Sequence, residues 1–305
     1  MLSARPLPVF ASVAARAAAH FGSLARALEA LAGALLGVER EMRDLAQEYR
    51  LSIPNCRLVL YIKLAKSRRP RALYWGATFR VAMADGIRRW RSHIKGRLTG
   101  RTIYRVALRW SERERFFRFD KRRLALNRRH AHLARALARM RRLVLGCCVP
   151  IPTVPPGPPP AAEFCANLAE EPALLEAAWR VAWALAAVEG DMLRLVEGAR
   201  PGLPTSNLFP YVSSHGNYLA LGWAIPELIV RNAKLAKGRR HVASGLSANV
   251  LRALRIPRPF WPSLRDTDRA MRALRREHAR YAKVVGRVRR LASRMPADEN
   301  PRMPA

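Results

Sequence analysis

The two halves of the chain carry similar residues in the same order, on either side of a proline-rich segment. Ala34–Met42 (ALLGVEREM) resembles Ala184–Met192 (ALAAVEGDM), and single matches continue in the same order toward the C-terminus. The matched pairs include Pro54/Pro204, Leu58/Leu208, Tyr61/Tyr211, Leu73/Leu221, Trp75/Trp223, Lys95/Lys237, Arg97/Arg239, Asp120/Asp268, Arg128/Arg276 and His130/His278. Because such a series is rare by chance, the sequence predicts a tandem duplication. It also counts against a spurious reading frame, although a duplicated piece of DNA would carry the same pattern.

The proline-rich segment divides the two copies. Seven prolines fall between residues 150 and 160, and this density favours extended polyproline backbone, which acts as a semi-rigid spacer. We therefore expect repeat unit one at residues 1–149, a linker at 150–162, and repeat unit two, a degenerate copy, at 163–305.

Each copy is expected to fold as a helix, a small antiparallel sheet and a long basic helix. Apolar residues at three-and-four spacing predict the helices, and aromatic and β-branched runs interrupted by glycine predict the strands. The expected elements are opening helices 24–49 and 174–197, strands 58–64, 72–81, 208–212 and 218–225, an extra hairpin of 102–110 and 115–119 in unit one, and closing helices 120–145 and 268–294. The predicted fold class is α+β, mainly helical, with each opening helix packed against its closing helix.

The charge of the chain is large and unevenly distributed. Lys and Arg number 56 against 22 Asp and Glu, which gives a formal net charge of +34. Residues 51–150 contain 27 basic and 4 acidic residues, and residues 201–305 contain 20 and 6. GC-rich codon usage explains why the cations are mostly Arg, but it does not explain this alternation. The pattern indicates a polyanionic partner, nucleic acid first and an acidic membrane surface second.

The predicted nucleic-acid-binding face consists of arginines in the later part of each copy. On the first closing helix, few acidic residues lie within reach to pair with them. The candidate binding residues are Arg97, Arg101, Arg105, Arg109, Arg122, Arg123, Arg128, Arg129, Arg135, Arg239, Arg240, Arg275 and Arg276. In the expected strand 102–110, the alternation of Arg101, Arg105 and Arg109 with apolar residues suits either a phosphate-tracking face or the solvated side of a half-buried strand. We expect loss of residues 51–150 to weaken polyanion binding more than loss of 201–305.

Three aromatic residues near this face have two interpretations. Tyr61, Tyr74 and Trp75 could stack on unpaired bases. However, Tyr61 and Trp75 are matched by Tyr211 and Trp223, near which the second copy has no charged residues. A core position is therefore favoured for both.

The sequence gives little support for catalysis. His130-Ala-His132 lies in a helical context, where positions i and i+2 diverge, and the second copy has Arg280 in place of the second histidine. We expect His130 and His278 at a helix–sheet contact, and Asp120 and Asp268 as helix N-caps. Glu39 and Glu41, like Glu189 and Asp191, fall on different helix faces. No cofactor or metal site is predicted, and an enzyme is disfavoured.

The sequence therefore predicts a non-enzymatic nucleic-acid-binding protein, with duplex DNA slightly favoured over structured RNA because the basic helices are long. The alternative is an assembly protein whose neutral helices, 24–49 and 174–197, bind a protein partner while the basic face meets acidic protein or lipid. No run approaches the ~18 apolar residues of a membrane span, and four Cys residues show no C-x-x-C spacing. The expected location is cytoplasmic or nucleoid-associated, with an organelle presequence at the N-terminus left open.

Overall fold

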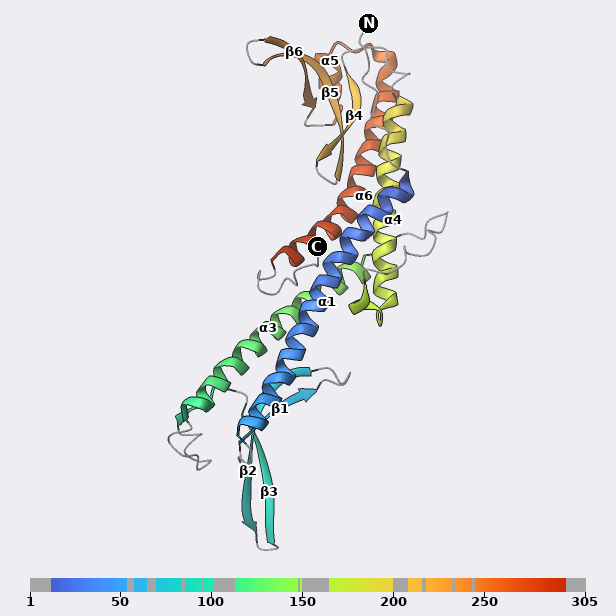
Figure 1. Ribbon diagram of the computed structural model, residues 1–305. Helices are drawn as coiled ribbons and strands as arrows, with labels where there is room; N and C mark the ends of the chain where they lie inside the picture. The colour runs from blue at the N-terminus through green and yellow to red at the C-terminus, as the bar shows by residue number, and fades with distance from the viewer. Residues whose placement is uncertain are drawn as a thin grey trace. The chain divides into compact units, whose positions relative to one another are not determined.

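The protein is a mainly helical α+β chain with two small antiparallel sheets (Figure 1). The computed structural model describes residues 12–53, 58–64, 70–83, 86–94, 96–100, 113–147, 149, 165–199, 208–215, 218–231, 234–242 and 245–294. The predicted linker, 150–162, lies outside these residues, as do Arg101, Arg105 and Arg109.

The chain forms two compact units. Unit A contains Leu28–Met140 and Arg294–Ala305, and unit B contains Met1–Ala27 and Arg141–Ser293. Helices α1 (Val13–Ser52) and α3 (Arg113–Leu145) each contribute residues to both units. Because α1 has 40 residues, it spans roughly 60 Å and is longer than a single small domain requires.

Unit A contains a three-stranded antiparallel sheet and two long helical segments. The strands are β1 (Leu58–Leu64), β2 (Pro70–Met83) and β3 (Gly86–Ile94), in the order β1-β2-β3. The α1 and α3 segments lie side by side, as predicted for the opening and closing helices, and Figure 1 shows the ends of β2 and β3 extending as a ribbon beyond them.

An aromatic cluster joins the sheet of unit A to both of its helices. Tyr49 of α1 makes edge contacts with Trp75 of β2 and with Phe116 and Phe119 of α3, at ring-centroid distances of 5.0, 6.1 and 5.3 Å. The Tyr49 hydroxyl also donates a hydrogen bond to the carbonyl of Leu58. All four rings are buried, so the prediction of a core position for Trp75 is confirmed.

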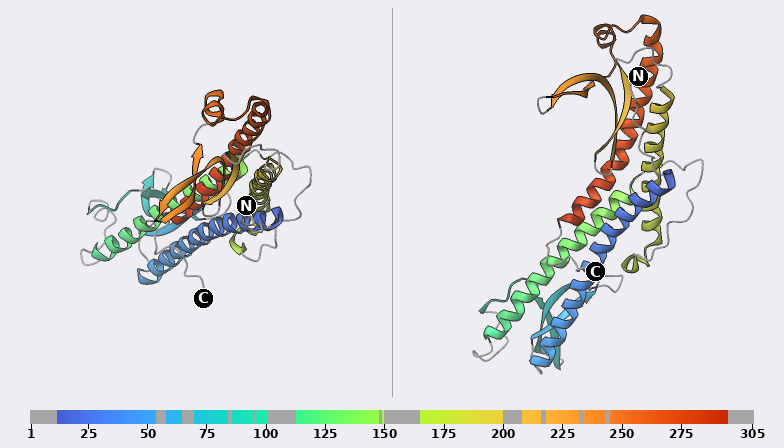
Figure 2. Two further views of the ribbon diagram at one scale, coloured as in Figure 1. Left: turned by 90° about the horizontal axis from the view of Figure 1, so that it is seen from above. Right: turned by 45° about the horizontal axis from the view of Figure 1, so that its top comes forward.

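Unit B repeats this order of elements. It contains α4 (Pro172–Ala199), β4 (Phe209–His215), β5 (Tyr218–Arg231), β6 (Lys234–Val242), α5 (Ala248–Ala253) and α6 (Trp261–Ser293), with short 3-10 turns η2 (Ala166–Leu168) and η3 (Arg258–Phe260). The sheet order is β4-β5-β6, and α4 packs along α6 (Figure 2, right). The strands have the same lengths as those of unit A, namely 7, 14 and 9 residues.

Several helix boundaries differ from the sequence-based expectation. Helix α1 begins at Val13 rather than residue 24, because the alanine-rich segment favours helix and Ser12 accepts a hydrogen bond from the Ala15 amide. Both closing helices begin seven residues before the predicted starts, at Arg113 and Trp261. In α6, Pro262 stands in the first turn, where proline is tolerated.

The extra hairpin was predicted incorrectly. Residues 115–119 belong to α3, because Phe116 and Phe119 begin the three-and-four spacing of its buried face. Residues 102–110 lie outside the described part of the chain. The third strand of each sheet, β3 or β6, was not predicted, since its arginines and lysines hide any apolar alternation.

Helix α1 also contains an 18-residue window that is apolar enough to cross a membrane by length and composition. Half of that window is buried inside the structure. Core helices of soluble proteins and N-terminal signal sequences meet the same criterion of length and composition.

Candidate nucleic-acid interface

A buried carboxylate of α3 organises the surface of unit A. Asp120 is 2% exposed, and its two oxygens accept hydrogen bonds from the indole nitrogen of Trp75 at 2.8 Å and the amide of Leu98 at 2.9 Å. Asp120 therefore ties β2 and the segment after β3 to α3. The prediction that Asp120 caps the helix is wrong, because the helix begins seven residues earlier and the side chain points into the fold.

The same arrangement occurs in unit B. Asp268 of α6 accepts hydrogen bonds from the indole nitrogen of Trp223 at 2.9 Å and the amide of Leu246 at 3.1 Å. The donors stand 45 and 22 residues before the carboxylate in both units. Asp268 is likewise not a helix cap, and the bonds establish which positions of the two units correspond.

Arg123 neutralises Asp120 from inside unit A. Its guanidinium is fully buried, lies 2.8 Å from the carboxylate, and donates to the carbonyls of Leu73 and Gly96 at 3.2 and 2.6 Å. The prediction that Arg123 belongs to an exposed binding face is therefore wrong. Arg123 therefore stabilises the packing of α3 against the sheet, but its guanidinium is not accessible to phosphate.

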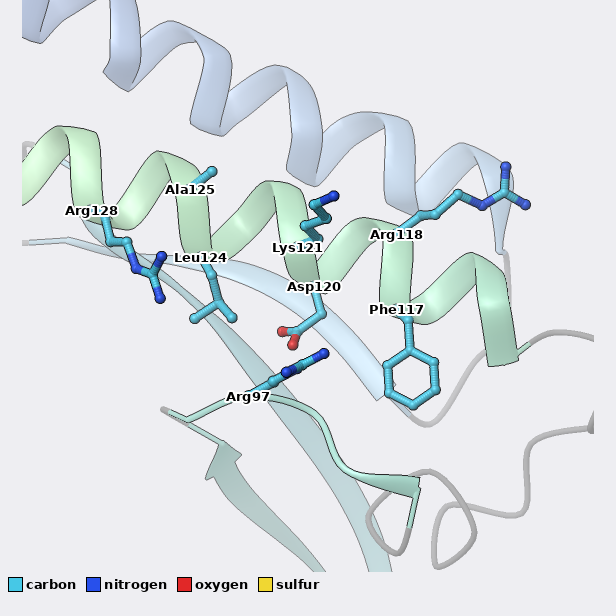
Figure 3. Close-up of a pocket in the computed structure, with 8 residues that line it drawn as sticks. All are labelled: Arg97, Phe117, Arg118, Asp120, Lys121, Leu124, Ala125 and Arg128. Atoms are coloured by element: carbon cyan, nitrogen blue, oxygen red, sulfur yellow. The ribbon is translucent and has the colours of Figure 1, made fainter.

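A surface cavity of about 550 Å³ lies on the outer side of Asp120. Figure 3 shows Arg97 and Asp120 pointing toward each other, with Phe117 on one side and Arg128 on the other. The residues that line the cavity are Arg97, Phe117, Arg118, Asp120, Lys121, Leu124, Ala125 and Arg128. Four of these are exposed cations, and the one carboxylate already has Arg123 as its partner, so the cavity favours an anion.

The four cations of the cavity are available to a ligand. Within the part of the chain that the structure describes, none of Arg97, Arg118, Lys121 and Arg128 forms an ion pair with a carboxylate. Other arginines of α3 behave differently. Arg122 pairs with Glu48 at 2.8 Å and Arg129 with Glu41 at 2.9 Å. These two predicted binding residues therefore form intramolecular ion pairs at the protein surface.

The remaining predicted binding residues are scattered. Arg135 is exposed on α3 and donates to the carbonyl of Ala131, whereas Arg275 donates to the carbonyl of Leu221 at 2.7 Å and is partly buried. Arg276 is exposed on α6, and Arg239 and Arg240 lie in β6. Of the predicted residues that the structure describes, the cavity therefore brings together two, Arg97 and Arg128.

Sequence reasoning missed three residues of the cavity and a second group of cations. Phe117 and Arg118 were overlooked because 115–119 was expected to be a strand, whereas Lys121 fell in the predicted closing helix and was not selected. On one continuous helix, the i, i+4 spacing of Phe117 and Lys121 places them on the face that continues to Leu124 and Arg128. In the β2–β3 ribbon, Arg80 pairs in register with Arg89.

The histidines contact the opening helices rather than the sheets. His130 lies 3.7 Å from Glu39 in unit A, and His278 lies 3.4 Å from Glu189 in unit B. The described residues contain no group of three His, Cys, Asp or Glu side chains able to hold a metal ion. The predicted position of these histidines at a helix–sheet contact is therefore corrected to a helix–helix contact.

Unit B contains a buried charge cluster centred on Glu189. Its carboxylate lies 3.0 Å from the Arg16 guanidinium and 3.1 Å from Nε2 of His20. Burial alone raises the pKa of Glu189, but the hydrogen bonds with His20 and His278 and the charges of His20 and Arg16 lower that pKa to about 2. The cluster joins α1, α4 and α6 and has a structural role.

Comparisons with protein families, with curated proteins and with solved structures give no match, so the function of this surface is argued from its own residues.

Proposed function

We propose that the protein binds nucleic acid without enzymatic activity, through the exposed cations around the cavity of unit A, and that DNA is favoured over RNA. The observation that supports this most strongly is the grouping of Arg97, Arg118, Lys121 and Arg128 around one cavity with no internal carboxylate partner for any of them among the described residues. Arginine and lysine in this density are stabilised by phosphates, whose oxygens accept their hydrogen bonds and neutralise their charge.

The charge distribution supports the same function. Helix α3 carries twelve basic and two acidic residues, and most of its basic side chains are exposed. A helix with this charge excess repels itself unless counterions or a polyanion cover it. Release of those counterions from nucleic acid supplies the favourable free energy of binding.

A mobility-shift titration tests the proposal. We expect the full-length protein to retard labelled DNA at low salt and to lose much of its affinity as salt rises from about 50 to 200 mM, as counterion release requires. The ratio of absorbance at 260 and 280 nm should also fall after a high-salt wash. No binding at low salt, or binding that does not respond to salt, would overturn the proposal.

The alternative, an assembly protein that uses the neutral helices 24–49 and 174–197, has less support. Glu41 and Glu48 of α1 pair with arginines of α3, and α4 packs along α6. These faces are therefore already occupied within the chain. A protein partner recovered after nuclease treatment would favour the alternative.

We also propose that the two units arose by tandem duplication, with repeat unit one at 1–149 and repeat unit two at 163–305. The equal strand lengths and the paired Trp–Asp and Leu–Asp hydrogen bonds support it. A nucleic-acid-binding role corresponds to a cytoplasmic or nucleoid-associated location.

A further inference from the structure

Unit B has a region equivalent to the cavity of unit A, and in unit B an arginine side chain fills it. The shared hydrogen bonds to Asp120 and Asp268 make Leu124 equivalent to Arg272, and Arg97 equivalent to Gly245. In unit B, the Arg272 guanidinium binds Asp268 from the outer side, with Nε 2.9 Å from the carboxylate. In unit A, that outer side is the cavity, because Arg123 binds Asp120 from within.

The two arrangements differ in the space beside the carboxylate. A Cβ atom at Gly245 would overlap the Arg272 guanidinium, so a larger residue there would require Arg272 to shift from its place over Asp268. Unit A has Arg97 at that position and the shorter, uncharged Leu124 opposite it. Each unit therefore has one arginine at these two positions. In unit B it binds the carboxylate, and in unit A it lines the cavity.

Two further cavity positions of unit B neutralise each other. Asp266 stands where unit A has Arg118, and it forms an ion pair with Arg269, which stands where unit A has Lys121. Arg265 replaces Phe117 and lies over the ring of Trp261 at 5.7 Å. Unit B therefore lacks the aromatic ring, and its equivalents of Arg118 and Lys121 pair with each other, whereas Arg276, the equivalent of Arg128, remains exposed.

The cavity of unit A combines features suited to a nucleotide rather than to a phosphate alone. Its volume of about 550 Å³ falls within the range of small-molecule sites. Phe117 is 36% exposed and stands at one end of the cavity, Arg128 stands at the other end, and Arg97 lies between them (Figure 3). An aromatic ring beside cations matches a base beside its phosphate, and the ring can stack only on a base that is not already stacked in a duplex.

We propose that this cavity binds one unpaired nucleotide of a single-stranded nucleic acid, with its base against Phe117 and its phosphate between Arg97 and Arg128. This inference rests on the proposed function and refines it from nucleic acid in general to single strands at one site. Unit B contributes no second site of this kind, because Arg272 and the Asp266–Arg269 pair occupy it.

A charge-neutral exchange tests the inference. The double variant Arg97→Gly with Leu124→Arg places the Gly245–Arg272 residue pair of unit B at the equivalent positions of unit A and leaves the net charge unchanged. Fluorescence anisotropy would measure binding of a labelled oligothymidine of about 15 nucleotides and of a duplex of the same length, each at low salt. We expect the wild-type protein to prefer the single strand and the double variant to bind it at least about tenfold more weakly.

Two further variants separate the site from a general loss of structure. Phe117→Ala should weaken single-strand binding by about five- to a hundredfold, and Phe117→Trp should restore it. The matched control is Gly245→Arg with Arg272→Leu in unit B, which also preserves net charge and should not weaken binding. Thermal unfolding of each variant confirms that the fold is retained.

The outcomes distinguish the two proposals. If the wild-type protein binds DNA with the expected salt dependence but the double variant and Phe117→Ala bind the single strand equally well, the inference is wrong and the proposed function stands. A preference for duplex also overturns the inference alone. If neither oligonucleotide binds the wild-type protein at low salt, the proposed function fails.

Discussion

The indole nitrogen of Trp75 donates a hydrogen bond to the carboxylate of Asp120 at 2.8 Å, although the two residues are 45 positions apart in the chain. This bond joins a strand to a helix at the base of the basic cavity. The same residue types form the same bond in unit B, between Trp223 and Asp268 at 2.9 Å. This connection between strand and helix is therefore common to both units, whereas the outer side of the carboxylate faces the cavity in unit A and binds Arg272 in unit B.

Removal of the indole donor should destabilise unit A. Trp75→Phe preserves most of the ring contacts with Tyr49 and Phe116 but leaves a buried carboxylate with one hydrogen bond fewer. We expect the free energy of unfolding to fall by about 1–3 kcal/mol, as measured by urea denaturation. Trp183→Phe is the control, because Trp183 is only half-buried and its main contact is an edge contact with Trp179. An equal loss in both variants would contradict a special role for the Trp75–Asp120 bond.

Neutralising the two equivalent carboxylates should have unequal effects. Asp120→Asn leaves the fully buried Arg123 without an anionic partner, which costs about 3–5 kcal/mol of unfolding free energy. Asp268→Asn affects Arg272, whose side chain is 53% exposed and remains solvated, so the loss should be smaller by at least about 1 kcal/mol. Chemical denaturation of the two variants gives the comparison directly. Equal losses would show that the burial of Arg123 does not matter to stability.

The Glu189 cluster should make unit B sensitive to acid. Because the pKa of Glu189 is lowered from 4.5 to about 2 in the folded protein, its ionised form contributes stability above about pH 4.5 that is lost as the pH falls toward 2. The loss attributable to this group is about 3 kcal/mol, at 1.36 kcal/mol per pKa unit. Glu189→Gln should be less stable than the wild-type protein at pH 7 and should converge with it near pH 2. The exposed Glu176→Gln is the control, and a constant difference between wild type and Glu189→Gln across this pH range would refute the assignment.

The sequence predicted the helices and the hairpins better than their ends. The apolar spacing of α1 and α4 and the aromatic runs of β1, β2, β4 and β5 determine these elements locally. All six are present, although α1 begins well before residue 24 and β5 continues beyond residue 225. The start of α3 was missed because Phe116 and Phe119 have high strand propensity in isolation, and helical packing against Tyr49 overrides it. The start of α6 was missed because Pro257, Pro259 and Pro262 suggested broken structure, although Pro262 stands in the first turn of the helix.

The candidate site was predicted less completely, for a reason that sequence periodicity cannot reveal. Arg123 and Arg128 look alike in the sequence, yet Arg123 is buried against Asp120 and Arg128 is exposed at the cavity. The distinction depends on Leu73 and Gly96, whose carbonyls come from the sheet and accept the Arg123 hydrogen bonds. Likewise, the match of Arg97 with Arg239 suggested an equivalence, but Arg239 lies within β6 and Gly245 occupies the equivalent position.

The salt dependence of DNA binding in two quadruple variants tests the central claim most directly. One variant replaces Arg97, Arg118, Lys121 and Arg128 with alanine, and the other replaces Arg40, Arg43, Arg50 and Arg139, which are exposed in unit A outside the cavity. Both variants have four fewer positive charges, so net charge alone predicts equal effects. We expect the cavity variant to bind DNA much more weakly and to show a shallower dependence of log K on log salt, by about 0.7–0.9 for each phosphate that the protein no longer neutralises, while the other variant stays close to wild type. Equal slopes and affinities in the two variants would contradict a localised nucleic-acid site.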